Sequence, residues 1–546
     1  MKKPIHFFLL LWIVAAAFNI AFSNNVNVTN VTVTGRNTTA GVNNAANYAL
    51  VQFDITWENS WRTSSAPNNW DAAWVFVKYK VSGGEWNHAK LNATGHVAPT
   101  GSTITPASDG TGAFIYRSEN GTGTFSKTGV QLRWNYGLNS VADEATMDIQ
   151  VFAIEMVYVP QGAFSLGSGG SDSAEFYQSP SKANVFPVTS ESAINVGSTA
   201  GYLFYSLRGS ATTGSGGDTT GPIPASYPKG YNAFYCMKYE ISQQQYVEFL
   251  NTLTYVQQSW CSTTGVTTAA NPGLAAGTLI FSGLTYRNGI VIQTPGVATA
   301  TPAVYACNLN GNTVYGETDD GKNVSCNYLN WHHLASFLDW SGLRPMSELE
   351  YEKACRGTIA AVPEEYAWGS TSMTANAGLN NPGMISETGS TAGANIIVDS
   401  AAAVHGPMRV GAFATTLTDR QSSGATYYGI MDMCGNVTER VVNAGYISGR
   451  SFTGLHGDGI LNTIGEATTD YWPGINGNLS ATTANNIYGG TTGVKMNAAA
   501  GGGYKGGHWN RNDALRSVRV SDRFYGARNN AACTSSNGGR GVRTAP

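Results

Sequence analysis

Charged residues are scarce in this chain. Lys, Arg, Asp and Glu make up 12% of its 546 residues, and the formal net charge is −3. Proteins that bind DNA or RNA present a basic field to the phosphates, and proteins that imitate nucleic acid carry an acidic run. Because the composition offers neither, we expect no nucleic-acid partner.

The seven cysteines lack the spacings that hold a structural metal. There is no CxxC pair and no Cys/His cluster at zinc spacing. Cys261, Cys307 and Cys326 lie in one loop-rich stretch, where we expect a disulfide among them, with the connectivity open. The odd total leaves at least one thiol outside any intramolecular pair.

Long apolar runs are also absent after the N-terminus. Residues 1–23 combine Lys2 and Lys3 with the run FFLLLWIVAAAF and end in small residues, which is the pattern of a signal peptide. The run is short for a membrane span, and no later stretch could form a transmembrane segment. No Cys follows the run, so we expect no lipid anchor. We therefore expect an exported protein, secreted or held at the cell surface.

Residues 24–152 have the texture of an all-β, sandwich-like domain. Runs such as 48–57, 74–81 and 147–154 are rich in β-branched and aromatic residues and are separated by Gly, Ser, Asn and Pro. Exposed tryptophans here would suggest stacking on sugars, but packing in a β core is the commoner role and the one we favour. The six tryptophans of this region are Trp57, Trp61, Trp70, Trp74, Trp86 and Trp134.

The pattern changes near residue 153, where helices begin to alternate with long polar connections. Ser242 and Asn330 can each cap a helix, and Ser347 with Glu350 forms a capping box in a helix that Gly357 ends. Insertions at about 168–228, 262–322, 369–427 and 455–498 are rich in glycine and polar residues, and we expect none of them to form a core of its own. Loops of this length are functional or disordered.

Six blocks of sequence then occur in a familiar order: 156–167 (MVYVPQGAFSLG), 234–251 (FYCMKYEISQQQYVEFLN), 343–357 (LRPMSELEYEKACRG), 366–369 (YAWG), 428–440 (YGIMDMCGNVTER) and 501–508 (GGGYKGGH). Together they resemble the formylglycine-generating enzyme, or sulfatase-modifying factor, family. The resemblance implies that residues 153–546 form an α+β domain with a C-type lectin-like fold and long loop insertions. It does not by itself imply an activity.

The chemistry of that family's oxidases depends on two copper-binding cysteines just after an RGGSW-like segment. Here the segment is 501–505, and Gly507 and Asn512 lie where the thiols would be needed. Thiolate is the soft ligand that Cu(I) requires, so we expect no copper site. Relatives with a non-haem iron site use histidines, but the neighbours His332 and His333 would point in different directions on a helix. We place them at the surface or in a cap.

Three further histidines, His405, His456 and His508, have no spacing that predicts a shared metal, so we expect no iron site either. The resemblance does imply a structural Ca²⁺, bound in the family by a GNVWE-like loop. In this chain the corresponding ligands are Asn436, Val437 and Glu439, and oxygen ligands suit this cation. The alternative is a tight turn with a left-handed Asn436 and a Glu439 held in a buried hydrogen-bond network.

The C-terminal segment 508–546 lacks Lys, Glu, Gln and Met entirely. Asn codons ending in C cannot yield these residues when their adenines are randomised, but they can yield Phe, Tyr, Ser, Cys, Arg, His, Asp, Gly, Ala and Thr. The segment RVSDR at 519–523 and the ending NGGRGVRTAP resemble the variable proteins of diversity-generating retroelements, which implies a mutable ligand-binding face. The alternative is a fixed loop rich in turn-forming residues.

The resemblance separates this segment into variable and fixed positions. Arg519, Asp522, Arg523, Arg540 and Arg543 would hold the scaffold through charge-assisted hydrogen bonds. Aromatic and small polar side chains suit an adaptable binding surface. The predicted ligand-binding residues are His508, Trp509, Asn510, Asn512, Phe524, Tyr525, Arg528, Asn529, Asn530, Cys533, Thr534 and Ser535.

Three functional hypotheses remain open. The chain is an exported, non-catalytic protein that binds an unknown protein or glycan, or a metal-dependent oxidoreductase with relocated ligands, or a structural surface-layer or matrix component. We favour the first, because the thiols of the family's oxidases are missing and the C-terminal composition matches that of a binding face.

Overall fold

The computed structural model describes residues 26–207, 216–262, 269–281, 284–298, 300–399, 404–415, 417–478, 501–511, 516–528 and 532–546. It is mostly β, with five α-helices in these ranges. The predicted signal peptide at 1–23 lies outside them. Of the helices described, none has the length and apolar character needed to span a bilayer.

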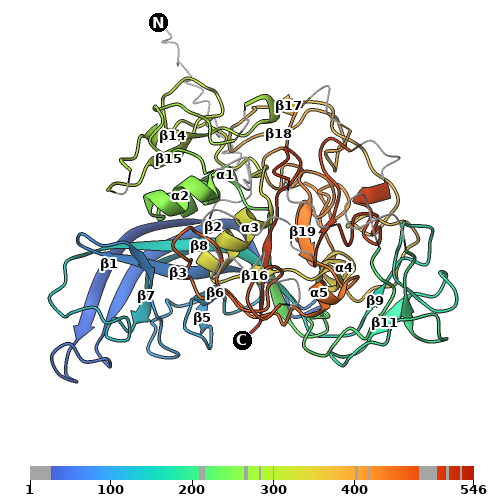
Figure 1. Ribbon diagram of the computed structural model, residues 1–546, viewed down its shortest axis with the longest axis horizontal. Helices are drawn as coiled ribbons and strands as arrows, with labels where there is room; N and C mark the ends of the chain where they lie inside the picture. The colour runs from blue at the N-terminus through green and yellow to red at the C-terminus, as the bar shows by residue number, and fades with distance from the viewer. Residues whose placement is uncertain are drawn as a thin grey trace, which may run out of the picture.

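The N-terminal part consists of strands that belong to two sheets (Figure 1). A three-stranded sheet has the order β1-β2-β7, and a larger sheet has the order β16-β21-β13-β8-β3-β6-β5, with β4 added beside β3. Alternate residues of β2, β3 and β7 are buried in one apolar cluster between the sheets, as period-2 patterning requires. The strands are β1 (Asn27–Asn37), β2 (Tyr48–Arg62), β3 (Asp71–Val81), β4 (Trp86–His88), β5 (Ser102–Pro106), β6 (Ala113–Arg117), β7 (Gly121–Trp134) and β8 (Met147–Val159).

Strand β8 joins the N-terminal part to the rest of the molecule. It pairs with β3 over the full length from Asp71↔Val157 to Val81↔Met147, and its other edge pairs with β13 from Phe234↔Val159 to Met237↔Met156. The boundary expected near residue 153 therefore lies inside a strand. The two parts share one continuous sheet.

The remaining elements are short and are spread along residues 164–544. They are β9 (Phe164–Leu166), β10 (Tyr177–Gln178), β11 (Phe186–Val188), β12 (Leu203–Phe204), β13 (Phe234–Met237), α1 (Gln243–Leu250), α2 (Tyr255–Cys261), η1 (Leu284–Tyr286), β14 (Ile290–Thr294), β15 (Val304–Cys307), α3 (Trp331–Trp340), β16 (Arg344–Pro345), α4 (Glu348–Arg356), β17 (Leu379–Asn380), β18 (Thr388–Gly389), β19 (Glu439–Val442), α5 (Ile447–Arg450), β20 (Gly502–Lys505), η2 (Arg516–Val518) and β21 (Gly541–Thr544).

The predicted helix starts are confirmed. Ser242, Asn330 and Ser347 cap α1, α3 and α4, each with a reciprocal capping box. Gly357 follows α4 with a φ of 72°. Helix α2, which Thr254 caps in the same way, was not predicted. Helix α3 packs against the large sheet, where Trp340 contacts Phe76 and Phe152 edge to face, and α1 packs on α3 through the Phe249 and Trp340 rings.

The insertions form little core of their own and add side chains to shared cores. Phe176, Leu203 and Tyr205 from the first insertion, and Ile290 and Tyr305 from the second, are buried in the largest cluster with α1 and α3. Residues 394–413 are an exception, because several of their side chains form a small separate cluster around Trp509. The glycine-rich connections therefore follow the surface while their few apolar residues anchor them.

Two expectations about side chains can be compared with the structure. Trp57, Trp74 and Trp134 are almost completely buried, and the other three N-terminal tryptophans are partly buried, in agreement with a packing role. The disulfide expected among Cys261, Cys307 and Cys326 is wrong. Cys307 and Cys326 carry free thiols, and the Cys261 thiol donates to the carbonyl of Gly465 at 3.4 Å.

Candidate functional site

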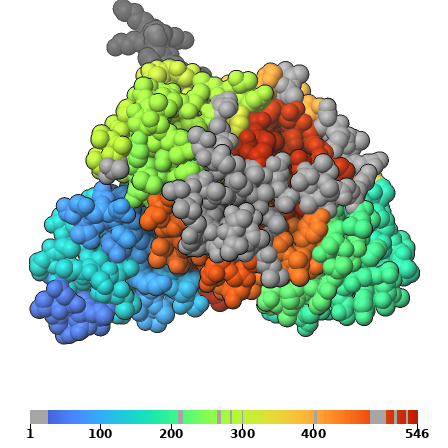
Figure 2. Space-filling view, viewed as in Figure 1, coloured from blue at the N-terminus to red at the C-terminus, as the bar shows by residue number. Residues whose placement is uncertain are grey.

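A pocket of about 170 Å³ lies where the C-terminal segment returns to the end of β20, and we call it the C-terminal pocket. Residues after 500 contribute twelve of its thirteen lining residues, and Thr438 is the other. Figure 2 shows part of this C-terminal region, in red, at the surface of the molecule. The lining residues are Thr438, Tyr504, Lys505, Gly507, His508, Arg511, Ser517, Asp522, Tyr525, Arg528, Thr534, Ser536 and Asn537.

Short backbone contacts set the shape of the pocket. Strand β20 pairs with β19, and the Tyr504 amide donates to the carbonyl of Tyr525 at 3.0 Å, which holds the returning chain against β20. A Cβ at Gly503 would lie only 1.8 Å from the carbonyl oxygen of Gly526, so glycine is required for this approach. The segment that carries Tyr525 is therefore held against the strand by backbone geometry.

Buried ion pairs fix the segment at both sides of the pocket. The Arg523 guanidinium donates to both carboxylate oxygens of Glu348, at 2.7 and 2.8 Å, and neither side chain is exposed. Arg540 donates to Glu439 at 2.8 and 3.1 Å, also without exposure. The Arg523 pair is bidentate and so fixes orientation as well as distance, whereas both nitrogens of Arg540 bond the same oxygen of Glu439. The predicted scaffold role of these arginines agrees with the geometry.

The other predicted scaffold residues make similar contacts. Arg519 pairs with Asp172 and Glu364, and Asp522 accepts the Ser173 and Phe524 amides. Arg543 pairs with Asp109 of the N-terminal part at 2.5 Å. All of these fixed charges are therefore used in holding the segment to its surroundings.

Tyr525 is the central aromatic residue of the pocket. The guanidinium carbons of Arg511 and Arg528 lie 4.8 and 4.9 Å from the centre of its ring, close enough for cation–π attraction. The Phe524 ring lies edge to face with it, at 4.7 Å. Tyr525, Phe524 and Arg528 are each partly exposed. This arrangement presents a flat ring flanked by two cations.

The charge of the pocket is positive at neutral pH. Lys505, Arg511 and Arg528 line it, against one carboxylate, Asp522, whose oxygens already accept backbone amides. The buried Lys505 ammonium also lies 3.9 Å from Glu352, so the positive charge of the pocket comes mainly from the two arginines. Burial, with Arg511 nearby, lowers the pKa of His508 to about 4, so this ring is neutral at pH 7. The pocket is thus suited to an anionic group.

The donor atoms of the pocket do not fit copper. None of the described residues that line it is a cysteine. A Cβ placed on Gly507, whose φ is 67°, would lie 2.3 Å from Cγ1 of Val518, so a thiol at this position would require the chain to move. The other expected position, residue 512, lies outside the described residues. The soft ligands that Cu(I) needs are therefore missing from the described lining.

The predicted ligand-binding residues separate into groups. His508, Tyr525, Arg528 and Thr534 line the pocket, and Phe524 adjoins it. Asn510 is exposed, whereas Cys533 and Ser535 are partly exposed beside the pocket. Asn512, Asn529 and Asn530 lie outside the described residues.

Trp509 requires a correction, because it is only 1% exposed and cannot present its ring to a ligand. Its indole N–H donates to the carbonyl of Ser535 at 2.9 Å, and its amide donates to that of Asn436 at 2.9 Å. Residues of the third insertion cover the ring.

The turn predicted to bind Ca²⁺ is compact. Asn436 is left-handed, with a φ of 56°, and its side-chain amide donates to Glu240 and Ser325 at 2.7 Å each. Its carbonyl accepts the Trp509 amide, the Val437 amide donates to Glu240, and Glu439 carries the ion pair with Arg540. These contacts match the alternative of a tight turn in a buried network, although Oε2 of Glu439 accepts no hydrogen bond there, and the cation remains a prediction.

The histidines lie differently from the expectation. His332 and His333 are fully buried in α3, so a surface position is wrong for both, although the Asn330 amide donates to His333 in the capping box. His332 lies 3.8 Å from the Cys261 sulfur. His456 accepts the Thr544 amide at 3.0 Å. His405, His456 and His508 do not form a ligand cluster among the described residues.

Sequence reasoning missed Lys505 and Arg511 as pocket residues. Lys505 belongs to the family's 501–508 block, and its ammonium reaches the carbonyl of Asp522 at 2.8 Å. Arg511 lies three residues after His508 and bonds Ser517 at 2.9 Å. The position of Arg511 between Asn510 and Asn512, two predicted ligand-binding residues, was the available signal for it.

Comparison with protein families supplies one match. The model of the sulfatase-modifying factor enzyme 1-like domain matches residues 143–545, which includes β8, the helices and the whole C-terminal pocket. None of the curated proteins compared with the chain matches it.

Proposed function

This chain belongs to the sulfatase-modifying factor family, and from that premise we propose that it is an exported binding protein without the family's oxidase chemistry. The C-terminal pocket captures an anionic group of a protein or glycan. The observation that carries the proposal is Tyr525 between Arg511 and Arg528, on a segment whose neighbouring arginines are buried in ion pairs.

In this arrangement, one set of side chains holds the backbone in place and another set contacts the ligand. Arg523 and Arg540 are fully buried and hold the backbone, whereas Tyr525 and Arg528 are partly exposed and contact the ligand. A rigid backbone reduces the entropy that is lost when the ligand binds. An aromatic ring with flanking guanidinium groups attracts a carboxylate, sulfate or phosphate next to a flat apolar group.

The same division would allow the exposed positions to mutate without loss of the fold, and we propose that a retroelement diversifies them. The N-terminal two-sheet unit, which we assign to the sandwich-like class, shares its large sheet with β21, the strand that follows the pocket residues Ser536 and Asn537 in the chain. The test of diversification is to sequence the locus in sibling clones. A second copy of codons 508–546 that differs at adenines, beside a reverse transcriptase, is the expected result. An invariant segment with no second copy would remove this part of the proposal.

The binding function is tested with the secreted full-length chain on arrays of acidic peptides and sulfated glycans. We expect the variants Tyr525→Ala and Arg528→Ala to lose at least 10-fold in affinity for any hit. Arg133→Ala is the matched control, because Arg133 lies over the ring of Tyr48 at 3.9 Å in the N-terminal unit, away from the pocket. Equal losses in all three variants, or hits that ignore the pocket, would contradict the proposal.

The oxidoreductase alternative predicts a different observation. It requires a redox-active metal that copurifies with the chain in stoichiometric amount and oxidation of a thiol substrate. Metal analysis of protein purified without chelators, with an oxygen-consumption assay on cysteine-containing peptides, distinguishes it from a binding protein. The surface-layer alternative requires ordered assembly of the purified chain, which electron microscopy would detect.

A further inference from the structure

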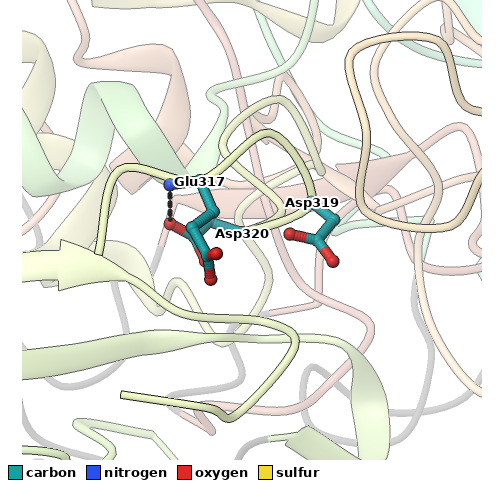
Figure 3. A group of neighbouring side chains, drawn as sticks. All are labelled: Glu317, Asp319 and Asp320. Atoms are coloured by element: carbon teal, nitrogen blue, oxygen red, sulfur yellow. Dashed lines mark hydrogen bonds between the residues drawn. The ribbon is translucent and has the colours of Figure 1, made fainter. Parts of the chain in front are cut away.

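The second insertion contains a cluster of carboxylates far from the C-terminal pocket in sequence. Glu317, Asp319 and Asp320 lie on one loop, residues 308–322, which we call the acidic loop (Figure 3). One oxygen of each side chain lies within 4.8 Å of the other two. Among the described residues, no other group of three or more His, Cys, Asp or Glu side chains meets this criterion.

The acidic loop folds back on itself to bring these groups together. The Glu317 amide donates to Oδ2 of Asp320 at 2.8 Å, and the Leu309 amide donates to the Asp320 carbonyl at 3.1 Å. The side-chain amides of Asn310 and Asn312 donate to Glu317, at 3.2 and 2.6 Å. Amide donors thus partly offset the repulsion of the carboxylates.

One oxygen in this cluster has no such compensation. Asp320 is 0% exposed, and its Oδ1 accepts no hydrogen bond of normal geometry. Burial raises the pKa of this carboxyl, although the Gly316 amide, like that of Glu317, acts to lower it. Asn308, at the start of the loop, is 3% exposed, and its Oδ1 also lacks a donor. A buried carboxylate oxygen without a donor is costly, and the cost rises when two further carboxylates lie beside it. The nearby ammonium of Lys322 donates to the carbonyl of Gly316 at 3.0 Å.

We propose that the acidic loop binds one calcium ion through Glu317, Asp319 and Asp320, with Asp320 Oδ1 as a central ligand. The donors are all oxygens at irregular positions on one loop, which Ca²⁺ tolerates and the strict octahedron of Mg²⁺ does not. Asn310 can add an amide oxygen, because a half-turn of its side chain exchanges oxygen for nitrogen.

The position of the loop gives the ion a structural task. The Gly321 amide donates to the carbonyl of Gly383 in the third insertion, and the Gln244 amide at the start of α1 donates to the carbonyl of Lys322. A cation in the acidic loop would therefore fasten the second insertion to the third and to the first helix. This site is separate from the turn at Asn436 and does not depend on the proposed binding function.

The test uses the full-length secreted chain, stripped with a chelator and titrated with Ca²⁺ by calorimetry. We expect a site with a dissociation constant on the order of 10⁻⁴ M, typical of extracellular modules, and a rise in melting temperature on binding. Asp319→Asn, at a partly exposed position, should weaken binding at least 10-fold and keep a native circular dichroism spectrum. Asp320→Asn should do the same or more.

The matched control is Asp148→Asn, which removes an exposed carboxylate paired with Lys80 on the N-terminal unit. It should leave calcium affinity unchanged. Calcium binding of equal affinity in Asp319→Asn and in the control overturns the proposal, and so does a wild-type chain that binds no Ca²⁺ at 10 mM. Loss confined to the acidic-loop variants also separates this site from any ion at Asn436.

Discussion

The buried pair between Arg523 and Glu348 allows the strongest quantitative prediction. The change is Arg523→Ala, which leaves the Glu348 carboxylate fully buried. Among the described residues, the Ala444 amide, at 2.7 Å, is then its remaining hydrogen-bond donor. Breaking a buried pair by removing one partner costs about 3 to 5 kcal/mol. We expect the upper end of this range, because the guanidinium also lies 3.8 Å from the Phe176 ring centre and 4.6 Å from that of Tyr205.

The assay is equilibrium unfolding in guanidinium chloride, followed by tryptophan fluorescence. The matched control is Arg528→Ala, five residues further on, where a partly exposed guanidinium should cost less than about 1 kcal/mol because it is screened by water. The double variant Arg523→Met with Glu348→Leu should recover about 2 kcal/mol relative to Arg523→Ala, because no unpaired charge stays buried. A cost below about 1 kcal/mol for Arg523→Ala would refute the reasoning, since the pair could then not be holding the segment.

Four further predictions concern the pocket, its protonation, the thiols and the turn at Asn436. The double change of Phe524 and Tyr525 to Ala should abolish ligand capture in the array assay while costing less than about 2 kcal/mol of unfolding free energy, because both rings are partly exposed; a larger loss would mark them as core. The folded-state pKa of His508, about 4, lies below its unfolded value near 6.5, so its contribution to stability is full above pH 6.5 and is lost as the pH falls toward 4. In His508→Gln, the loss of unfolding free energy between pH 6.5 and pH 4 should be smaller by on the order of 1 to 3 kcal/mol, as measured by denaturation curves at each pH. An unchanged pH dependence would exclude a neutral His508 ring. A thiol reagent should modify one cysteine, Cys533, in the native chain and seven after denaturation, because the other six are at most 5% exposed; two native disulfides seen by mass spectrometry would contradict this. If the turn binds Ca²⁺, calorimetry should show a second site that survives Asp320→Asn and is lost in Glu439→Gln, whereas retention of that site in Glu439→Gln would place the ion elsewhere.

Local chemistry made part of the fold predictable from the sequence. The caps at Ser242, Asn330 and Ser347 depend only on residues three positions apart, and all three form as expected. The scaffold role of Arg523 and Arg540 followed from the motif that contains them, and their partners are indeed buried carboxylates.

Contacts between distant segments accounted for the failures. Trp509 packs in a cluster with Ile397, Met408 and Phe413, and nothing in the sequence near position 509 indicates that cover. His332 and His333 are buried because insertions pack around α3, which the helix pattern alone could not reveal. The role of β8 in joining the two parts was not apparent for the same reason, since a strand that pairs with β3 on one edge and β13 on the other has the pattern of any other strand.

Strand β8 also determines how the molecule responds to load. Its eleven paired positions with β3 and four with β13 leave no linker that could act as a hinge between the two parts. A torque applied at the ligand-binding face would pass through these paired positions to the N-terminal strands, where many backbone hydrogen bonds would resist it together. The orientation of the pocket relative to the first strands is therefore fixed by the backbone, and so is the direction from which a ligand can enter it.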